Sequence, residues 1–188
     1  SGQLGISLIK VLLKKNFKVI VTTRSISNAR KKIPIKSRNL KLVLLNVLKK
    51  NEISSLIKRF KPNYIYYFAS QSSPVISFKK NRVTYLSNVK GCLNFLEIIN
   101  LKDKKIKFIN ASSSEIFSSR VKKISLNSKK IPISPYGKAK LISYNKTKFF
   151  RDKKKLKAYN AIIFNSESYF RDKSFLIPKI CLAAIRAK

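Results

Sequence analysis

Apolar side chains recur along this chain in two alternating patterns. Residues 4–15 carry them three and four positions apart, as one face of a helix does, whereas residues 17–23 form a short β-branched run that is typical of a buried strand. The two patterns then alternate to the end of the chain. They predict strands at residues 40–45, 64–68, 105–110 and 158–165, and helices at residues 52–60, 81–100, 136–150 and 175–187.

This alternation predicts an α/β fold with a doubly wound parallel sheet. The pattern begins with a helix, and residues 1–5 (SGQLG) look like the second half of a glycine-rich strand-to-helix turn. The chain also contains no methionine. We therefore expect residue 1 to be a cut end, with the strand that feeds this turn lying upstream of it.

Composition excludes several kinds of catalytic site. The 188 residues include no histidine, which rules out Ser-His-Asp and Cys-His catalysis and imidazole metal ligands. The two cysteines, Cys92 and Cys181, are too few for a disulfide framework or a four-cysteine zinc site. A hydrophobic content of 44% is ordinary for a globular domain, and no apolar run approaches the ~20 residues of a membrane span.

The charge is the extreme feature of the composition. Lys and Arg total 43 against 7 Asp and Glu, for a formal net charge of +36, which suggests a polyanion-binding protein. However, 34 of the 43 are lysines spread along the whole chain, and nucleic-acid readers favour arginine. A coding bias toward Lys, Asn and Ile is therefore the favoured explanation of the charge, and polyanion binding remains the alternative.

The candidate chemistry lies in two segments. Tyr136 and Lys140 are four residues apart on a predicted helix and so share a face, where the ammonium favours the deprotonated phenol. Ser112–Glu115 closely follows the predicted strand at 105–110, and the carboxyl ends of strands are where α/β sheets place their sites. A polar loop for the serines and a turn cap for Glu115 are the alternatives without chemistry.

Two further features indicate an anionic cofactor. Gly2 and Gly5 open a predicted helix, where backbone N–H groups can bind a diphosphate. Arg24 follows the second predicted element of the chain, a strand, and in dinucleotide folds an arginine there suits a ribose 2′-phosphate. An ordinary loop-to-helix turn and a solvated arginine are the corresponding alternatives.

Together these motifs resemble the extended short-chain dehydrogenase/reductase family, within it the nucleotide-sugar 4,6-dehydratases, and most closely the GDP-mannose 4,6-dehydratase branch. The resemblance covers essentially the whole chain and implies a Rossmann-like fold. The segments that carry it are SGQLG (1–5), VTTRS (21–25), KPNYIYYFASQSSPVISF (61–78), NVKGCLNFLEII (88–99), NASSSEIF (110–117), SPYGKAK (134–140) and FNSES (164–168).

The resemblance implies a role for each matching residue. Tyr136 matches the base for oxidation at C4 of the sugar, Lys140 the lysine on the nicotinamide ribose, and Glu115 the acid/base for loss of water across C5–C6; Ser113, where the family usually has Thr, lies near O4. Expected NADP contacts are Ser1, Gly2, Gln3, Leu4, Arg24, Asn46, Val47, Phe68, Ala69, Ser70, Gln71, Ser72, Tyr136, Lys140 and Arg171. Expected substrate contacts are Ser72, Ser113, Asn165 and Lys179.

The implied protein is a cytoplasmic, homo-oligomeric enzyme that takes GDP-mannose and NADP, with no metal, no membrane and no specific nucleic acid. Residues 1–165 would form an incomplete cofactor domain and residues 166–188 the start of the substrate-binding portion. Another dehydratase or an epimerase of the family, or an inactive fragment, is the alternative. Asn46 and Ser166 depart from the family's Asp and His at the cofactor, and we expect this piece alone to bind NADP poorly.

Overall fold

The computed structural model describes residues 2–118 and 123–187. By its internal contacts the chain divides into two compact units, residues 1–45 with 165–188, and residues 46–164. In the described residues no helix is both long and apolar enough to cross a membrane.

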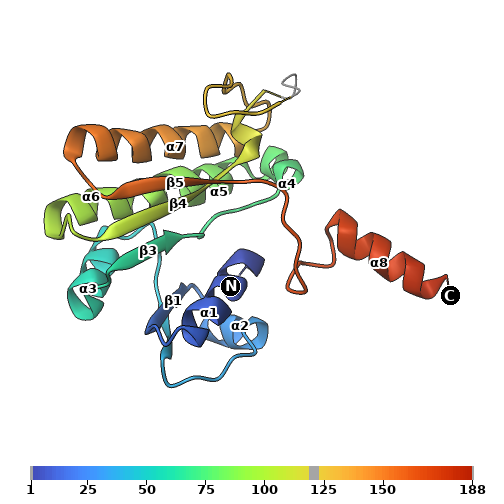
Figure 1. Ribbon diagram of the computed structural model, residues 1–188, viewed down its shortest axis with the longest axis horizontal. Helices are drawn as coiled ribbons and strands as arrows, with labels where there is room; N and C mark the ends of the chain where they lie inside the picture. The colour runs from blue at the N-terminus through green and yellow to red at the C-terminus, as the bar shows by residue number, and fades with distance from the viewer. Residues whose placement is uncertain (1, 119–122, 188) are drawn as a thin grey trace. The chain divides into compact units, whose positions relative to one another are not determined.

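The first unit is a two-stranded parallel sheet with helices (Figure 1). Its core packs Ile6 and Ile9 against Val19, Ala29 and Ile33. The short helix around Ala29 was not predicted, because its seven residues have few apolar positions and show no clear period. The hydroxyl of Ser25 caps this helix by accepting the backbone N–H of Asn28. The elements are α1 (Gln3–Lys14), β1 (Val19–Thr23), α2 (Ile26–Lys32), β2 (Leu40–Leu44) and α8 (Leu176–Arg186).

The second unit is a three-stranded parallel sheet in the order β3-β4-β5, covered by helices that also pack on one another. Tyr67, Phe95 and Phe108 form its aromatic core, with ring centroids 5.6–6.3 Å apart. The elements are α3 (Lys50–Phe60), β3 (Tyr64–Tyr67), α4 (Pro74–Lys79), α5 (Asn81–Tyr85), the π-helical turn η1 (Leu86–Lys90), α6 (Gly91–Lys102), β4 (Lys107–Ser113), the 3₁₀ turn η2 (Ser114–Ile116), α7 (Pro135–Lys154) and β5 (Ala158–Ile163).

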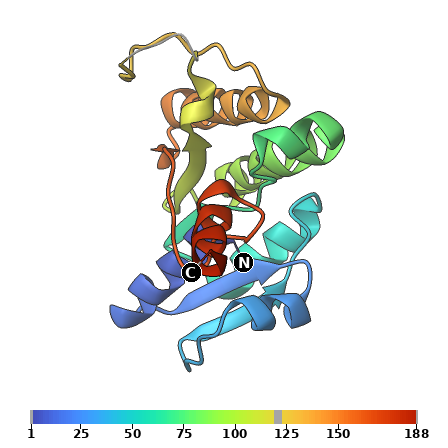
Figure 2. The same cartoon turned by 90° about the vertical axis from the view of Figure 1, so that its right-hand side faces the viewer.

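The structure confirms the predicted parallel α/β class, and it revises the predicted helix over 81–100 and strand over 105–110. The single helix predicted over 81–100 is α5, a π-helical turn and α6, drawn in Figure 2 as a nearly continuous green ribbon. The strand predicted over 105–110 is β4 and runs to Ser113, so Ser112 and Ser113 are strand residues and not part of a polar loop. Parallel pairing of Ala111, Ser112 and Ser113 with β5 carries this strand past residue 110, although these three residues have no β-branched side chain.

Strand pairing is confined to the two sheets in the part of the chain that the structure describes. β1 pairs with β2 on one side, and β3 pairs with β4 on one side. Each of these two strands thus has one unpaired edge in its own sheet, whereas β4 is paired on both sides. That an upstream strand would pair there stays a prediction, as does the division of the sequence at residue 165.

Candidate active site

Helix α7 presents Tyr136 and Lys140 to the end of the sheet. Ser134 caps the helix by accepting the N–H of Gly137 at 3.0 Å, and Pro135 occupies its first turn. This start places Tyr136 in the first turn and Lys140 one turn later on the same face, with side chains that are 7% and 3% exposed. The predicted pairing on one helix face is therefore present, and both groups are buried.

The ammonium of Lys140 joins α7 to two strand ends. Its Nζ donates to the carbonyl of Ala111 on β4 at 2.7 Å and to Oγ of Ser70, after β3, at 3.3 Å. It also lies 5.6 Å from the ring centroid of Tyr136. Burial lowers the pKa of Lys140 from its ordinary value to about 8, and Cys92 opposes this shift weakly. Lys140 is thus a buried cation that gives up its proton more readily than a surface lysine.

Ser113 and Glu115 lie where β4 ends. Ser113 is the last strand residue, is 8% exposed, and its Oγ accepts the N–H of Glu115 at 3.2 Å. Glu115 lies in the following turn η2 with an exposed side chain. Turn η2 packs against α7, so the hydroxyl and carboxylate share this end of the sheet with Tyr136.

Gly137 permits the close packing of α7 against η2, and replacing this glycine tests that packing. A Cβ on Gly137 would lie 2.5 Å from the backbone carbonyl oxygen of Glu115 and 2.9 Å from Pro132. We expect Gly137→Ala to force α7 from η2 and to lower the free energy of unfolding by about 1–3 kcal/mol, as overpacking does. Thermal unfolding measures this. Ala139→Gly in the same helix should cost only ~1 kcal/mol, and an equal loss in both variants would contradict the packing explanation.

The segment Phe68–Ser72 after β3 is held by the π-helical turn. The hydroxyl of Ser87 accepts the N–H of Gln71 at 3.2 Å, and Nδ2 of Asn88 donates to the Gln71 carbonyl at 3.1 Å. Thr84 donates to Oε1 of Gln71 at 3.3 Å. Sequence analysis missed these three positioning residues, although buried Asn88 within an apolar helical stripe was an available signal. Gln71 is therefore engaged in fixing the backbone that carries Ser70.

The remaining predicted residues of the second unit have other partners. The backbone N–H of Asn46 donates to the Glu52 carboxylate at 2.8 Å, and Oδ1 of Asn46 accepts the N–H of Leu48. Val47 lies against the position where a Cβ of Gly91 would be. Asn46 thus serves as a turn residue here. Phe68 is half-buried, whereas Ala69 and Ser72 are exposed.

The first unit holds the other predicted residues, and it brings Gln3 to the segment after β5. Nε2 of Gln3 donates to the Ser166 carbonyl at 2.8 Å, and Ser168 donates to Oε1 of Gln3 at 3.1 Å. Gly2 is the N-cap of α1, and Leu4 is half-buried in that helix. Ser1 lies outside the described residues.

Arg24, Asn165 and Lys179 are exposed, with Arg24 between β1 and the N-cap of α2. Arg171 pairs with Glu167 at 3.6 Å and stacks over Phe175. Among the described residues of this unit, the structure therefore brings Gln3 to the FNSES segment, which contains Asn165.

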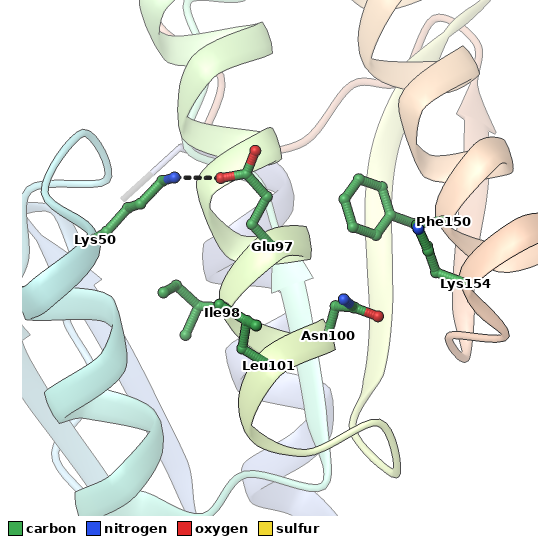
Figure 3. Close-up of a pocket in the computed structure, with 7 residues that line it drawn as sticks. All are labelled: Lys50, Glu97, Ile98, Asn100, Leu101, Phe150 and Lys154. Carbon is green, nitrogen blue, oxygen red and sulfur yellow. Dashed lines mark ion pairs between the residues drawn. The ribbon is translucent and has the colours of Figure 1, made fainter.

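A surface hollow lies elsewhere in the second unit. Its volume is about 360 Å³, and it sits on α6 with α3 and α7 at its sides (Figure 3). Lys50 and Glu97 form an ion pair across it at 2.5 Å. None of the predicted site residues lines it, so it is separate from the candidate site. Among the described residues, no cluster of three His, Cys, Asp or Glu could hold a metal ion.

Comparisons with known proteins identify the family to which the chain is similar. The family model described as GDP-mannose 4,6 dehydratase matches residues 1–188. The GDP-mannose 4,6-dehydratase of Vibrio cholerae is 29% identical over 96% of this chain and 51% of its own length. GDP-mannose 4,6 dehydratase 1 of Arabidopsis thaliana is 30% identical over 100% of this chain and 56% of its own. The chain spans about half the length of these relatives.

Solved structures share the fold. A UDP-glucose 4-epimerase from Brucella ovis in complex with NAD matches with a TM-score of 0.83 and 20% identity, over 100% of this chain and 59% of that one. DesIV, a dTDP-glucose 4,6-dehydratase from Streptomyces venezuelae with NAD and TYD bound, matches at 0.83 and 19%, over 99% and 60%. With the family model matched from end to end, the chain belongs to the GDP-mannose 4,6 dehydratase family.

Proposed function

We propose that the protein is an NADP-dependent dehydratase that converts GDP-mannose to GDP-4-keto-6-deoxymannose. The observation that supports this most is Lys140, a buried ammonium beside Tyr136 at the carboxyl end of the sheet. Membership of the family and the presence of Ser113 and Glu115 at the same sheet end add to it. The chain would supply four groups: a hydroxyl, a carboxyl, a phenol and an ammonium.

The residues fit a nicotinamide dinucleotide at two points. The Lys140 ammonium has three N–H donors, and two acceptors engage it among the described residues, which leaves one donor for a ribose hydroxyl. Arg24 is exposed at the end of β1 and would take the 2′-phosphate of NADP. When bound, the cofactor supplies the hydride chemistry, and the protein supplies placement and proton transfer.

Each side chain then has a defined task. Tyr136 accepts the proton of the sugar O4 hydroxyl, and Ser113 hydrogen-bonds that oxygen. Glu115 removes the C5 proton, which the adjacent C4 ketone makes acidic, and returns a proton to the departing C6 hydroxyl as water. Its exposure in the free protein leaves room for a substrate to reach it. Lys140 holds the nicotinamide ribose and stays charged below pH 8.

Product analysis tests this proposal. The full-length protein is incubated with GDP-mannose and NADP⁺, and the products are followed by mass spectrometry and NMR. We expect loss of one water and a 4-keto-6-deoxy sugar with no net change in NADP⁺. GDP-mannose recovered unchanged, or a C4 epimer of it, would refute the proposed reaction.

The choice of NADP over NAD gives a separate prediction. Arg24→Ala should weaken NADP⁺ binding roughly 10- to 100-fold, because a charge-assisted contact to the 2′-phosphate is lost. Binding of NAD⁺ should stay unchanged in calorimetric titration. Arg30→Ala, another exposed arginine in the same unit, is the control. Equal effects on both cofactors would contradict this role for Arg24.

A further inference from the structure

Parallel pairing gathers three lysine-rich turns at one edge of the second unit. Because β3, β4 and β5 run parallel, the turns that precede them meet at the amino end of the sheet, at the left of Figure 1. Backbone bonds join the turns directly: the N–H of Lys107 donates to Asn63, and that of Phe108 to Lys157, both at 2.9 Å. We call residues 58–61, 102–107 and 151–157, which combine the last residues of α3, α6 and α7 with the turns that follow them, the basic edge.

The basic edge is far richer in charge than the rest of the chain. Twelve of its seventeen residues are Lys or Arg, against 31 of the other 171, so an even compositional bias does not account for it. Two are acidic: Asp152 pairs with Arg151, and Asp103 accepts the N–H of Lys105. Most of the basic side chains are exposed. A strong positive potential is therefore concentrated at this edge.

The chemistry of the edge identifies its partner. We propose that the basic edge binds the phosphate backbone of nucleic acid without reading its sequence. Ten of its twelve basic residues are lysines, which engage phosphates as point charges, whereas base recognition favours the forked guanidinium of arginine. Strands ~4.8 Å apart set three such turns side by side, so that a linear polyanion can cross all of them.

A lipid surface fits the same edge less well. Helices and loops that lie on membranes insert apolar anchors. Here the aliphatic members of the turns, Ile106 and Leu156, are 2% and 3% exposed and belong to the core. Phe60 is half-buried. Within its seventeen residues the edge thus offers charge without a fully exposed apolar anchor, although the adjoining Leu101 is 74% exposed. It also lies at the opposite end of the strands from Ser113, so the proposed reaction and nucleic-acid binding use different surfaces.

Two matched triple variants test this inference. Lys104→Gln, Lys105→Gln and Lys157→Gln remove three charges from the edge. Lys90→Gln, Lys146→Gln and Lys148→Gln remove three exposed charges from the η1 turn and α7. The whole chain is titrated with fluorescein-labelled 20-nucleotide oligo-dT and a mixed-sequence 20-mer from 50 to 300 mM salt. Circular dichroism checks that each variant folds.

We expect wild type to bind both oligonucleotides equally and with a steep salt dependence. The edge variant should bind at least tenfold more weakly, with a log–log salt slope smaller by about 2, since each lost phosphate contact on a single strand contributes ~0.7. The control variant should stay within about twofold of wild type. Equal losses in both variants, no binding, or tighter binding of the edge to phosphatidylserine vesicles than to oligonucleotide would each overturn the proposal.

Discussion

Replacing Lys140 with methionine is expected to slow turnover strongly and to make the protein more stable at neutral pH. Lys140 is 3% exposed, and among the described residues its ammonium contacts a carbonyl and a hydroxyl rather than a carboxylate. Burial lowers its pKa from 10.5 to about 8, and a shift of that size corresponds to roughly 3 kcal/mol of destabilisation at neutral pH. Methionine fills much of the same volume without the charge, so we expect a gain of ~1–3 kcal/mol after the lost hydrogen bonds.

The sign of the pH dependence follows from the same pKa. Between pH 8 and 10.5 the unfolded chain holds a proton on Lys140 that the folded chain has released, so folding stability rises with pH across this window. The variant should lack that rise. Below pH 8 both states carry the charge, and the difference between wild type and variant should be greatest and constant. Denaturant unfolding at pH 7, 8, 9 and 10 measures this.

The catalytic rate of Lys140→Met should fall, whereas its stability should rise. Without the cation near Tyr136 and its contact to the ribose, the rate should fall roughly 10²- to 10⁴-fold. In wild type, the rate should decline as pH rises through 8. Lys146→Met, exposed on the same helix, is the control and should change neither quantity. A Lys140→Met protein that is less stable at pH 7 and still active would contradict both roles assigned to Lys140.

Replacing Glu115 with glutamine is expected to stop the reaction after oxidation at C4. The side chain is exposed in η2 and packs no core, so the fold and cofactor binding should be unaffected. The amide cannot take the C5 proton, and elimination should slow by roughly 10²- to 10⁴-fold. Because the hydride has no acceptor at C6 until water leaves, reduced cofactor should accumulate and absorb at the nicotinamide band.

A labelling experiment separates this step from the others. Wild type run in D₂O should place deuterium at C5 of the product, and Glu115→Gln should not. Glu167→Gln, another exposed carboxylate, is the control. Full dehydration by Glu115→Gln would remove the residue from the mechanism, and loss of C4 oxidation as well would assign it a binding role.

The fold class and the placement of Tyr136 and Lys140 on one helix face were predictable from local pattern. Tyr136 and Lys140 share a face because the helical period requires it once 136–150 is helical. Strand and helix alternation gave the parallel class for a similar reason. The short α2 and the full length of β4 were not predictable, since seven polar-rich residues have no readable period and Ala-Ser-Ser has no strand signature.

By itself, the sequence determined which side chains can act: hydroxyl, carboxylate, phenol and ammonium, in a chain with no imidazole. Tertiary structure decided what surrounds them. The hydrogen-bond partners of Lys140, Ser70 and Ala111, lie 70 and 29 residues away along the chain. Tertiary packing is therefore what buries this lysine and lowers its pKa. Parallel strand pairing likewise gathered scattered lysines into one edge, which no local period records.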